Sequence, residues 1–363
     1  STLTNSSGKL NFTRIDSIVR QLVDLQNSGR EVLLVSSGSI AAGMGELGFK
    51  EKPASIPEQQ ACAAVGQGLL IGIYNKFFRQ YGERAAQILL TSSDLENRNR
   101  YLNAFNTVDS LLSYGVIPVI NENDTVATNE IKVGDNDRLS ARVAGLVEAD
   151  LLINLSDVEG LYNGDPSSSD KNLKLISRVD TITDEIQQAA GGRGSKVGTG
   201  GMMTKIAAAK IAVNSGVMMI IGPGHKKNII LKLVEMAEKE ETDIGTTFTP
   251  CSDSLCKRKQ WLNYNIPPAG KLKVDAGAAE ALKKRGKSLL PGGIKDVEGE
   301  FSAGELVIIE DFTGEFARGI VNYSSEEIQQ IKGRHSDEII ELLGYYNQAE
   351  VVHRDNMVLG GDR

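Results

Sequence analysis

Short runs of aliphatic residues alternate with longer amphipathic stretches through most of this 363-residue chain. The first such stretch, residues 13–28, places Ile15, Val19 and Leu22 on one helical face, and Gly29 follows where a C-terminal cap belongs. The same reasoning predicts helices at 57–81, 98–114, 137–148 and 203–214, and strands at 32–35, 86–90, 116–120, 150–155 and 217–221. This alternation is typical of an α/β fold, with a mostly parallel open sheet sandwiched by helices.

The pattern changes after about residue 250, where the Pro267-Pro268-Ala269-Gly270 sequence indicates a linker. Short strands and turns follow, at 271–274, 304–309 and 319–321. We therefore expect a first domain over 1–250, a linker over 251–269 and a small β-rich domain over 270–350.

Composition narrows the class of protein. Apolar residues make up 40% of the chain and charged residues 24%, a balance typical of globular proteins. The net charge of −7 argues against a general binder of nucleic acid or of anionic membranes. The chain has three Cys and three scattered His, too few for a disulfide framework or a His-based metal site. Without a membrane-spanning apolar run, it is expected in the cytoplasm.

Ligands of parallel α/β sheets bind beyond the carboxyl ends of the strands, so the loops after residues 35, 120, 155 and 221 are the candidates. The first of these loops, Ser36-Ser37-Gly38-Ser39, leads from a strand into a segment of small residues. Hydroxyls and free N–H groups at a helix start can bind an anion. An ordinary strand-to-helix turn with a serine cap is the alternative interpretation.

Acidic and amide side chains gather in two neighbouring segments, Asn121-Glu122-Asn123-Asp124 and Gly134-Asp135-Asn136-Asp137. Carboxylates so dense would repel one another unless cations or hydrogen-bond donors offset their charge. Together with amides they suit an amino-acid substrate, whose ammonium needs acceptors and whose carboxylate needs donors. The alternatives are a solvated acidic loop or a calcium loop, although the residue order of an EF-hand is absent.

A glycine-rich segment, residues 198–205, opens the helix predicted at 203–214. Glycines let backbone amides approach phosphates, and Lys205 can reach a phosphoryl group in transfer. The segment matches neither a Walker A motif nor a dinucleotide-binding fingerprint, and a surface loop is the alternative. Ser156-Asp157, after the strand at 150–155, could hold a nucleotide or form a plain turn. These features favour phosphoryl transfer by Lys, Mg²⁺ and backbone amides.

Four blocks of the sequence resemble the amino acid kinase family: residues 35–43, VINENDTVAT at 119–128, IKVGDNDRLSA at 131–141 and GTGGMMTK at 198–205. Residues 270–346 resemble a PUA domain. Within the family, the blocks are most similar to members that phosphorylate L-glutamate. The resemblance implies ATP and Mg²⁺ as cofactors and L-glutamyl 5-phosphate as product, the first step of proline synthesis. It also implies inhibition by proline and a homodimer or homotetramer.

The resemblance further assigns roles by motif position. Ser37, Asp124 and Asn136 would bind glutamate, with Asn121 and Asp135 near it. Lys205 would stabilise the transferring phosphoryl group, and Asp137 would hold the catalytic lysines in place. The ATP site would be lined by Ser156, Asp157, Thr199, Gly200, Gly201, Met202, Met203, Thr204 and Lys205.

The chain departs from the family pattern at its first residues. Family members begin with a strand ending in Lys-x-Gly-Thr-Ser, and Ser1 resembles the last residue of that motif. We expect a preceding segment to supply the Lys and Gly, and a chain that truly starts at Ser1 to show almost no turnover.

Two other interpretations stay open at this point. One is a different amino acid kinase, acting on acetylglutamate, aspartate, carbamate or a nucleotide. The other is an RNA-binding protein with a degenerate kinase domain. Residues 268–346 carry 10 Lys and Arg against 14 Asp and Glu, a poor composition for binding a phosphate backbone. RNA is therefore not an expected partner.

Overall fold

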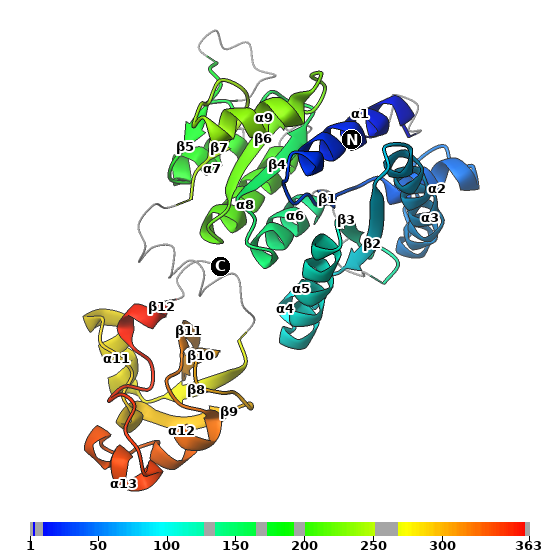
Figure 1. Ribbon diagram of the computed structural model, residues 1–363. Helices are drawn as coiled ribbons and strands as arrows, with labels where there is room; N and C mark the ends of the chain where they lie inside the picture. The colour runs from blue at the N-terminus through cyan, green and yellow to red at the C-terminus, as the bar shows by residue number, and fades with distance from the viewer. Residues whose placement is uncertain are drawn as a thin grey trace. The chain divides into compact units, whose positions relative to one another are not determined.

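A computed structural model of the chain describes residue 3 and residues 10–126, 135–164, 173–191, 200–250 and 268–359. The chain forms two compact units (Figure 1). The first unit comprises Ser1–Leu95, Leu102–Val213 and Val217–Pro250, and the second comprises Glu96–Tyr101, Asn214–Gly216 and Cys251–Arg363. The domain boundaries expected from the sequence stay a prediction.

Helices and strands alternate from residue 12 to residue 248. The helices are α1 Phe12–Asn27, α2 Ser39–Leu47, α3 Ile56–Gln80, α4 Ser92–Glu96, α5 Arg98–Ser113, α6 Asp135–Leu146, α7 Asp184–Gly191, α8 Gly200–Asn214 and α9 Ile229–Glu238. The strands are β1 Leu34–Val35, β2 Arg84–Leu90, β3 Val116–Glu122, β4 Leu151–Ser156, β5 Arg178–Val179, β6 Met218–Pro223 and β7 Thr246–Phe248. Each helix and strand expected over residues 13–221 is present, with ends that differ by a few residues.

The described strands of the first unit form two sheets instead of the single sheet expected. One is fully parallel, in the order β1-β3-β2. The other has the order β4-β6-β7-β5, in which only the β6–β7 pair is antiparallel. The mostly parallel α/β character is confirmed, and β1 and β4 each form one edge of their sheet.

Helices cover both faces of the second sheet (Figure 1). Along β6, Ile220 belongs to the core cluster that includes residues of α1 and α9. Its neighbours Met219 and Ile221 belong to a different cluster, with residues of α6 and α8. Successive side chains of a strand point to opposite faces, so this alternation places two buried layers around one sheet.

The second unit is β-rich, as the sequence predicted. Its strands are β8 Gly270–Val274, β9 Ile294–Glu298, β10 Leu306–Asp311, β11 Gly314–Ile320 and β12 Met357–Leu359, and its helices are α11 Ala276–Arg285, α12 Ser325–Ile331 and α13 Ile339–Leu343. The sheet order is β12-β11-β10-β8-β9, and only the β10–β8 pair is parallel. Among the described helices of both units, none is long and apolar enough to cross a membrane.

Candidate active site

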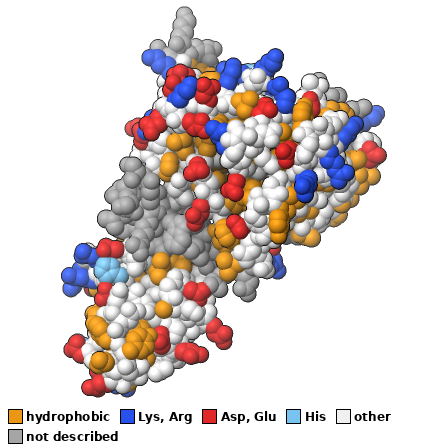
Figure 2. All heavy atoms as spheres, in the orientation of Figure 1, with side chains coloured by type: hydrophobic (Ala, Val, Ile, Leu, Met, Phe, Trp, Pro, Cys, Tyr) orange, Lys and Arg blue, Asp and Glu red, His pale blue; other side chains and the backbone are white. Residues whose placement is uncertain are grey.

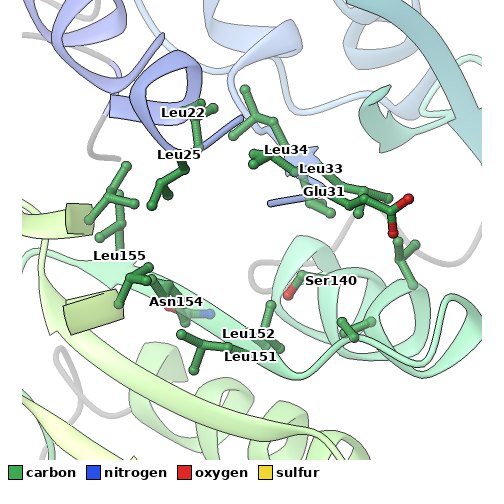
Figure 3. Close-up of a pocket in the computed structure, with 18 of the residues that line it drawn as sticks. Leu22, Leu25, Glu31, Leu33, Leu34, Ser140, Leu151, Leu152, Asn154 and Leu155 are labelled. Atoms are coloured by element: carbon green, nitrogen blue, oxygen red, sulfur yellow. The ribbon is translucent and has the colours of Figure 1, made fainter. Parts of the chain in front are cut away.

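A cavity of about 1020 Å³ lies in the first unit between the edge strands of its two sheets. Most of its wall is apolar. Leu22 from α1, Leu34 from β1 and Leu152 from β4 surround the open space (Figure 3). The loop that follows β1 and the strand β4 therefore border the same cavity.

Part of the polar lining of the cavity comes from three regions that carry predicted site residues or their neighbours. Ser36 and Ser37 come from the loop after β1, Asn136 and Asp137 from the first turn of α6, and Asn154 from β4. The structure thus joins the Ser36–Ser39 loop to the second acidic segment, although about 100 residues of sequence lie between them. Side chains that can bind an amino acid or a phosphate therefore line the same cavity.

Asp137 is the centre of a hydrogen-bonded group that we call the Asp137 cluster, formed by Asp137, Asn154, Thr204 and Lys205. The Lys205 ammonium Nζ lies 3.2 and 3.1 Å from the two carboxylate oxygens of Asp137. The Asn154 amide donates to Oδ1 at 2.8 Å, and the Thr204 hydroxyl donates to Oδ2 at 2.8 Å. Both oxygens are therefore occupied, and the ammonium is held in one place.

The Asp137–Lys205 ion pair is mostly shielded from water. The two side chains retain 16% and 15% of their accessible surface, so solvent screens their attraction less than it would on an open surface. Lys205 stands in the first turns of α8, where backbone N–H groups lack partners within the helix. Those N–H groups and the ammonium together make a surface suited to phosphate oxygens.

The first acidic segment forms a separate group, which we call the Asp124 loop: Ser39, Asn121 and Asp124. The Ser39 hydroxyl, in the first turn of α2, donates to Asp124 Oδ2 at 2.8 Å. Burial raises the pKa of Asp124 above its usual 3.8, and the Ser39 hydrogen bond and the Lys52 charge offset part of that rise. In contrast to Asp137, this carboxylate has no cation in contact among the described residues.

Two amide groups near the Asp124 loop and the cavity have polar atoms without a partner among the described residues. They are Nδ2 of Asn121, whose residue is 3% exposed, and Oδ1 of Asn136. A buried polar atom without a hydrogen bond costs about 1–3 kcal/mol, so such atoms are rare in native structures. One donor and one acceptor are thus left for a polar ligand.

Ser156 and Asp157 lie at the carboxyl end of β4, as expected. The Ser156 hydroxyl donates to Asp157 at 3.2 Å, and the Ser156 carbonyl accepts from the backbone of Gly224 at 2.6 Å. Ser156 is buried and Asp157 is exposed. Ser156 is thus the last paired residue of β4, and Asp157 follows it beyond the sheet, open to a ligand.

The remaining predicted site residues fall into three groups. Gly200, Gly201, Met202 and Met203 form the start of α8 together with Thr204. Asp135 is the first residue of α6, but its side chain is not described. Thr199 lies outside the described residues. Ser37, Asn136 and Asp137 line the same cavity, and Asp137 contacts Thr204 and Lys205. Asp124 is bonded to Ser39 and is not part of the cavity lining.

Sequence reasoning missed Asn154 and Ser39 as site residues. Asn154 is an amide within the aliphatic strand LLINLS, and a polar residue in a buried strand is a signal that it has a partner. Ser39 belongs to the first predicted loop, but only the folded chain shows that its hydroxyl is directed at Asp124.

The described residues contain no group of three or more His, Cys, Asp or Glu side chains that could hold a metal. Magnesium commonly binds to one or two carboxylates together with substrate phosphates, so a dense acidic cage is not required for it. The Asp137 oxygens, each already accepting hydrogen bonds, are a poor choice for a metal ligand.

Comparison with known proteins gives one consistent result. Residues 1–222 match the amino acid kinase family, and residues 270–343 match the PUA domain. A glutamate 5-kinase of Caldanaerobacter subterraneus subsp. tengcongensis is 53% identical over 360 residues, covering 99% of this chain and 95% of that protein. A glutamate 5-kinase of Moorella thermoacetica is 51% identical over 362 residues, covering 99% and 94%.

Among solved structures, the T. acidophilum isopentenyl phosphate kinase product complex matches with a TM-score of 0.45 and 17% identity, over 68% of this chain and 95% of that one. The sequence relatives are far closer and extend through both units. This chain therefore belongs to the amino acid kinase family, in the glutamate 5-kinase group, and carries a C-terminal PUA domain.

Proposed function

We propose that this protein transfers the γ-phosphoryl group of ATP to the side-chain carboxylate of L-glutamate. The product is L-glutamyl 5-phosphate, and the reaction is the first step of proline synthesis. The observation that carries the proposal is the Asp137 cluster: Asp137 lines the cavity together with Ser37 and Asn136, and it holds the Lys205 ammonium. Relatives at about half identity that are named glutamate 5-kinases support the choice of acid.

Lys205 acts on the phosphoryl group in transfer. A phosphoryl transition state spreads negative charge over its oxygens, so a positioned cation lowers the barrier more than it favours the ground state. Asp137 does not react. Its two oxygens orient the ammonium, while Thr204 and Asn154 keep the carboxylate from rotating.

Glutamate binds between the loop after β1 and the first turn of α6. The ionised Asp124 accepts from the substrate ammonium, and the unpartnered Oδ1 of Asn136 is a second acceptor. The Asn121 amide and the exposed Ser37 hydroxyl donate to carboxylate oxygens. Asp135 lies next to these groups in the sequence and belongs to the same site.

ATP binds along the start of α8, with Ser156 at the end of β4 and Asp157 just beyond it on the nucleotide side. A Mg²⁺ ion would be held mainly by the phosphates of ATP, because the Asp137 carboxylate is already saturated by donors. When bound, the ion neutralises charge on the phosphate oxygens.

Proline, which shares the α-ammonium and carboxylate of glutamate, competes at the Asp124 loop. The protein acts in the cytoplasm as a homodimer or homotetramer. The exposed residues Val65 and Leu69 on α3 support self-association, because large apolar side chains on the outer face of a helix are candidates for burial between copies.

One assay tests the proposal. The full-length protein is given ATP, Mg²⁺ and, in turn, glutamate, acetylglutamate, aspartate or carbamate, and the acyl phosphate formed is trapped with hydroxylamine. We expect product with glutamate, and less of it when proline is added. Product with another acid and none with glutamate would overturn the choice of substrate, while equal rates with and without proline would remove only the regulatory part.

The alternative of an RNA-binding protein with a degenerate kinase domain loses support from the structure. Lys205 and its partners are in place, and no continuous band of described Lys and Arg side chains crosses the face of the PUA domain shown in Figure 2. Salt-dependent binding of RNA by the full chain, without acyl phosphate formation, would favour that alternative instead.

A further inference from the structure

The helix α3 contacts the loop after β1 through one buried hydrogen bond. The Tyr74 hydroxyl lies 2.9 Å from Ser36 Oγ, and either group can be the donor. Tyr74 is fully buried, and Ser36 is 3% exposed. Ser36 directly precedes the substrate-binding residue Ser37, so this contact fixes the backbone at the start of that loop.

A second buried hydrogen bond joins the same helix to the other substrate loop. The Gln67 amide donates to the backbone carbonyl of Glu122 at 3.2 Å, and Gln67 is 6% exposed. Glu122 stands between Asn121 and the turn that carries Asp124. Tyr74 and Gln67 are seven residues apart, which is two helical turns, so one face of α3 holds both loops.

The contact between α2 and α3 adds a third connection. A Cβ atom at Gly66 would lie 1.8 Å from the carbonyl oxygen of Ser39, and one at Gly43 would lie 1.8 Å from that of Cys62. Glycine at these two positions lets the helix backbones touch. The start of α2, with the Ser39 hydroxyl on Asp124, is therefore fixed against the middle of α3.

The chemistry of these contacts suits a permanent support. Burial raises the pKa of Tyr74 to about 12, so its hydroxyl keeps its proton at any physiological pH. Substrate sites lose efficiency when their side chains move by a fraction of an ångström, and they depend on surrounding groups that lock them. The two loops are joined directly by the pairing of β1 with β3, which extends to Ser36 N and Ile120 O at 2.9 Å, and by the Ser39–Asp124 hydrogen bond; the contacts with α3 add a further restraint.

We infer that Tyr74 and Gln67 are positioning residues, which set the distance between the two glutamate-binding loops from the buried face of α3. The inference rests on the proposed function, because it names what holds that site. Tyr74 also lines the cavity, and its hydroxyl is paired with Ser36. Both act through Ser36 and through the backbone of Glu122.

Removal of single hydroxyl or amide groups tests this role. Tyr74→Phe keeps the buried ring, and Gln67→Met keeps the length of the side chain without the donor. Loss of one uncharged hydrogen bond corresponds to about a five-fold change in an equilibrium constant. We expect each variant to raise the KM for glutamate about five-fold, with the KM for ATP nearly unchanged.

Phe78→Leu is the matched control, since Phe78 is fully buried one turn beyond Tyr74 and packs near its ring without a polar contact to either loop. It should lower the melting temperature and leave the KM for glutamate unchanged. The pair Tyr74→Phe and Ser36→Ala should be non-additive, because each removes the same hydrogen bond. Additive effects, or a Phe78→Leu variant that raises the KM equally, would overturn the inference.

Hydrogen exchange in the absence of substrate separates this inference from the proposed function. Backbone amides of residues 36–43 and 122–125 should exchange faster in Tyr74→Phe and Gln67→Met than in the unmodified protein, and should be unaffected in Phe78→Leu. If glutamate proves not to be the substrate but exchange rises as described, the positioning role stands and only the assigned acid is wrong. If Tyr74→Phe and Gln67→Met are folded and their amide exchange rates are unchanged, the positioning role is wrong.

Discussion

The Asp137 cluster and the Asp124 loop use the same residue type in opposite ways. Asp137 has both oxygens occupied by a cation, a hydroxyl and an amide. Asp124 has one serine hydroxyl, a raised pKa and an unpartnered amide atom of Asn121 nearby. A carboxylate whose oxygens all have hydrogen-bond partners is typical of a structural support. A shielded carboxylate with few partners can still accept hydrogen bonds from a ligand. The difference supports the roles that we propose, in which Asp137 orients Lys205 and Asp124 receives the substrate.

The largest expected effect on the rate comes from removing Lys205, the cation of the Asp137 cluster. Lys205→Ala should lower kcat about 10²–10³-fold, the usual loss when one group that stabilises a transition state is removed. The KM for glutamate should change little, because Lys205 contacts Asp137 and not the Asp124 loop. Steady-state kinetics with varied glutamate measure both values, and unchanged turnover would contradict the assigned role.

The next effect concerns the Asp124 loop alone. Asp124→Asn removes the charge that we propose receives the substrate ammonium, and it should raise the KM for glutamate about 10–100-fold, as for a lost hydrogen bond to a charged group. Ser39→Ala, which removes only the 2.8 Å hydrogen bond to this carboxylate, is the milder comparison. A large fall in kcat without a change in KM would show that Asp124 acts on the reaction step and not, as we propose, on substrate binding.

Lowering the pH should weaken glutamate binding at the Asp124 loop. The pKa of Asp124 is raised above 3.8 mainly by burial, so the carboxylate takes up a proton at a higher pH than an exposed aspartate does. As pH falls toward that pKa, the KM for glutamate should rise, because the protonated form no longer attracts an ammonium. A pH profile of kcat/KM for glutamate, with the Asp124→Asn profile as control, measures this.

The raised pKa of Asp124 also affects the stability of the folded protein. A raised pKa means that the folded state favours the protonated carboxyl, so the ionised form destabilises the fold at neutral pH. Asp124→Asn should therefore raise the melting temperature at pH 7, and the gain should shrink as pH falls through the raised pKa. A melting temperature lowered at pH 7 would mean that Asp124 is a structural partner like Asp137.

The smallest expected effect refines the Asp137 cluster. Thr204→Val removes the hydroxyl that donates to Asp137 Oδ2 at 2.8 Å and should lower kcat about five-fold, since one neutral hydrogen bond is lost. Thr204→Ser should restore most of the rate because it keeps the hydroxyl. Equal losses in both variants would assign the effect to the methyl group instead of the hydrogen bond.

Periodicity alone predicted the helices and strands well because local patterns decide them. The buried face of α1 and the aliphatic runs of β3 and β4 have the expected ends within a few residues. The arrangement of strands was less accessible, since pairing depends on contacts between distant segments. The two separate sheets, with the antiparallel β6–β7 pair, were not expected from the sequence.

The sequence by itself determined the α/β class, the β-rich second unit, the acidic and glycine-rich motifs and the family resemblance, because each depends on residue type and spacing along the chain. Tertiary structure decided which of these groups meet. The resemblance implied that Asp137 holds Lys205, and the fold adds Thr204 and Asn154 as further partners of Asp137. Hydrogen bonds and burial depend on distances in space. Asp137 therefore gains its several partners, and Asp124 its single hydroxyl partner, only once the chain has folded.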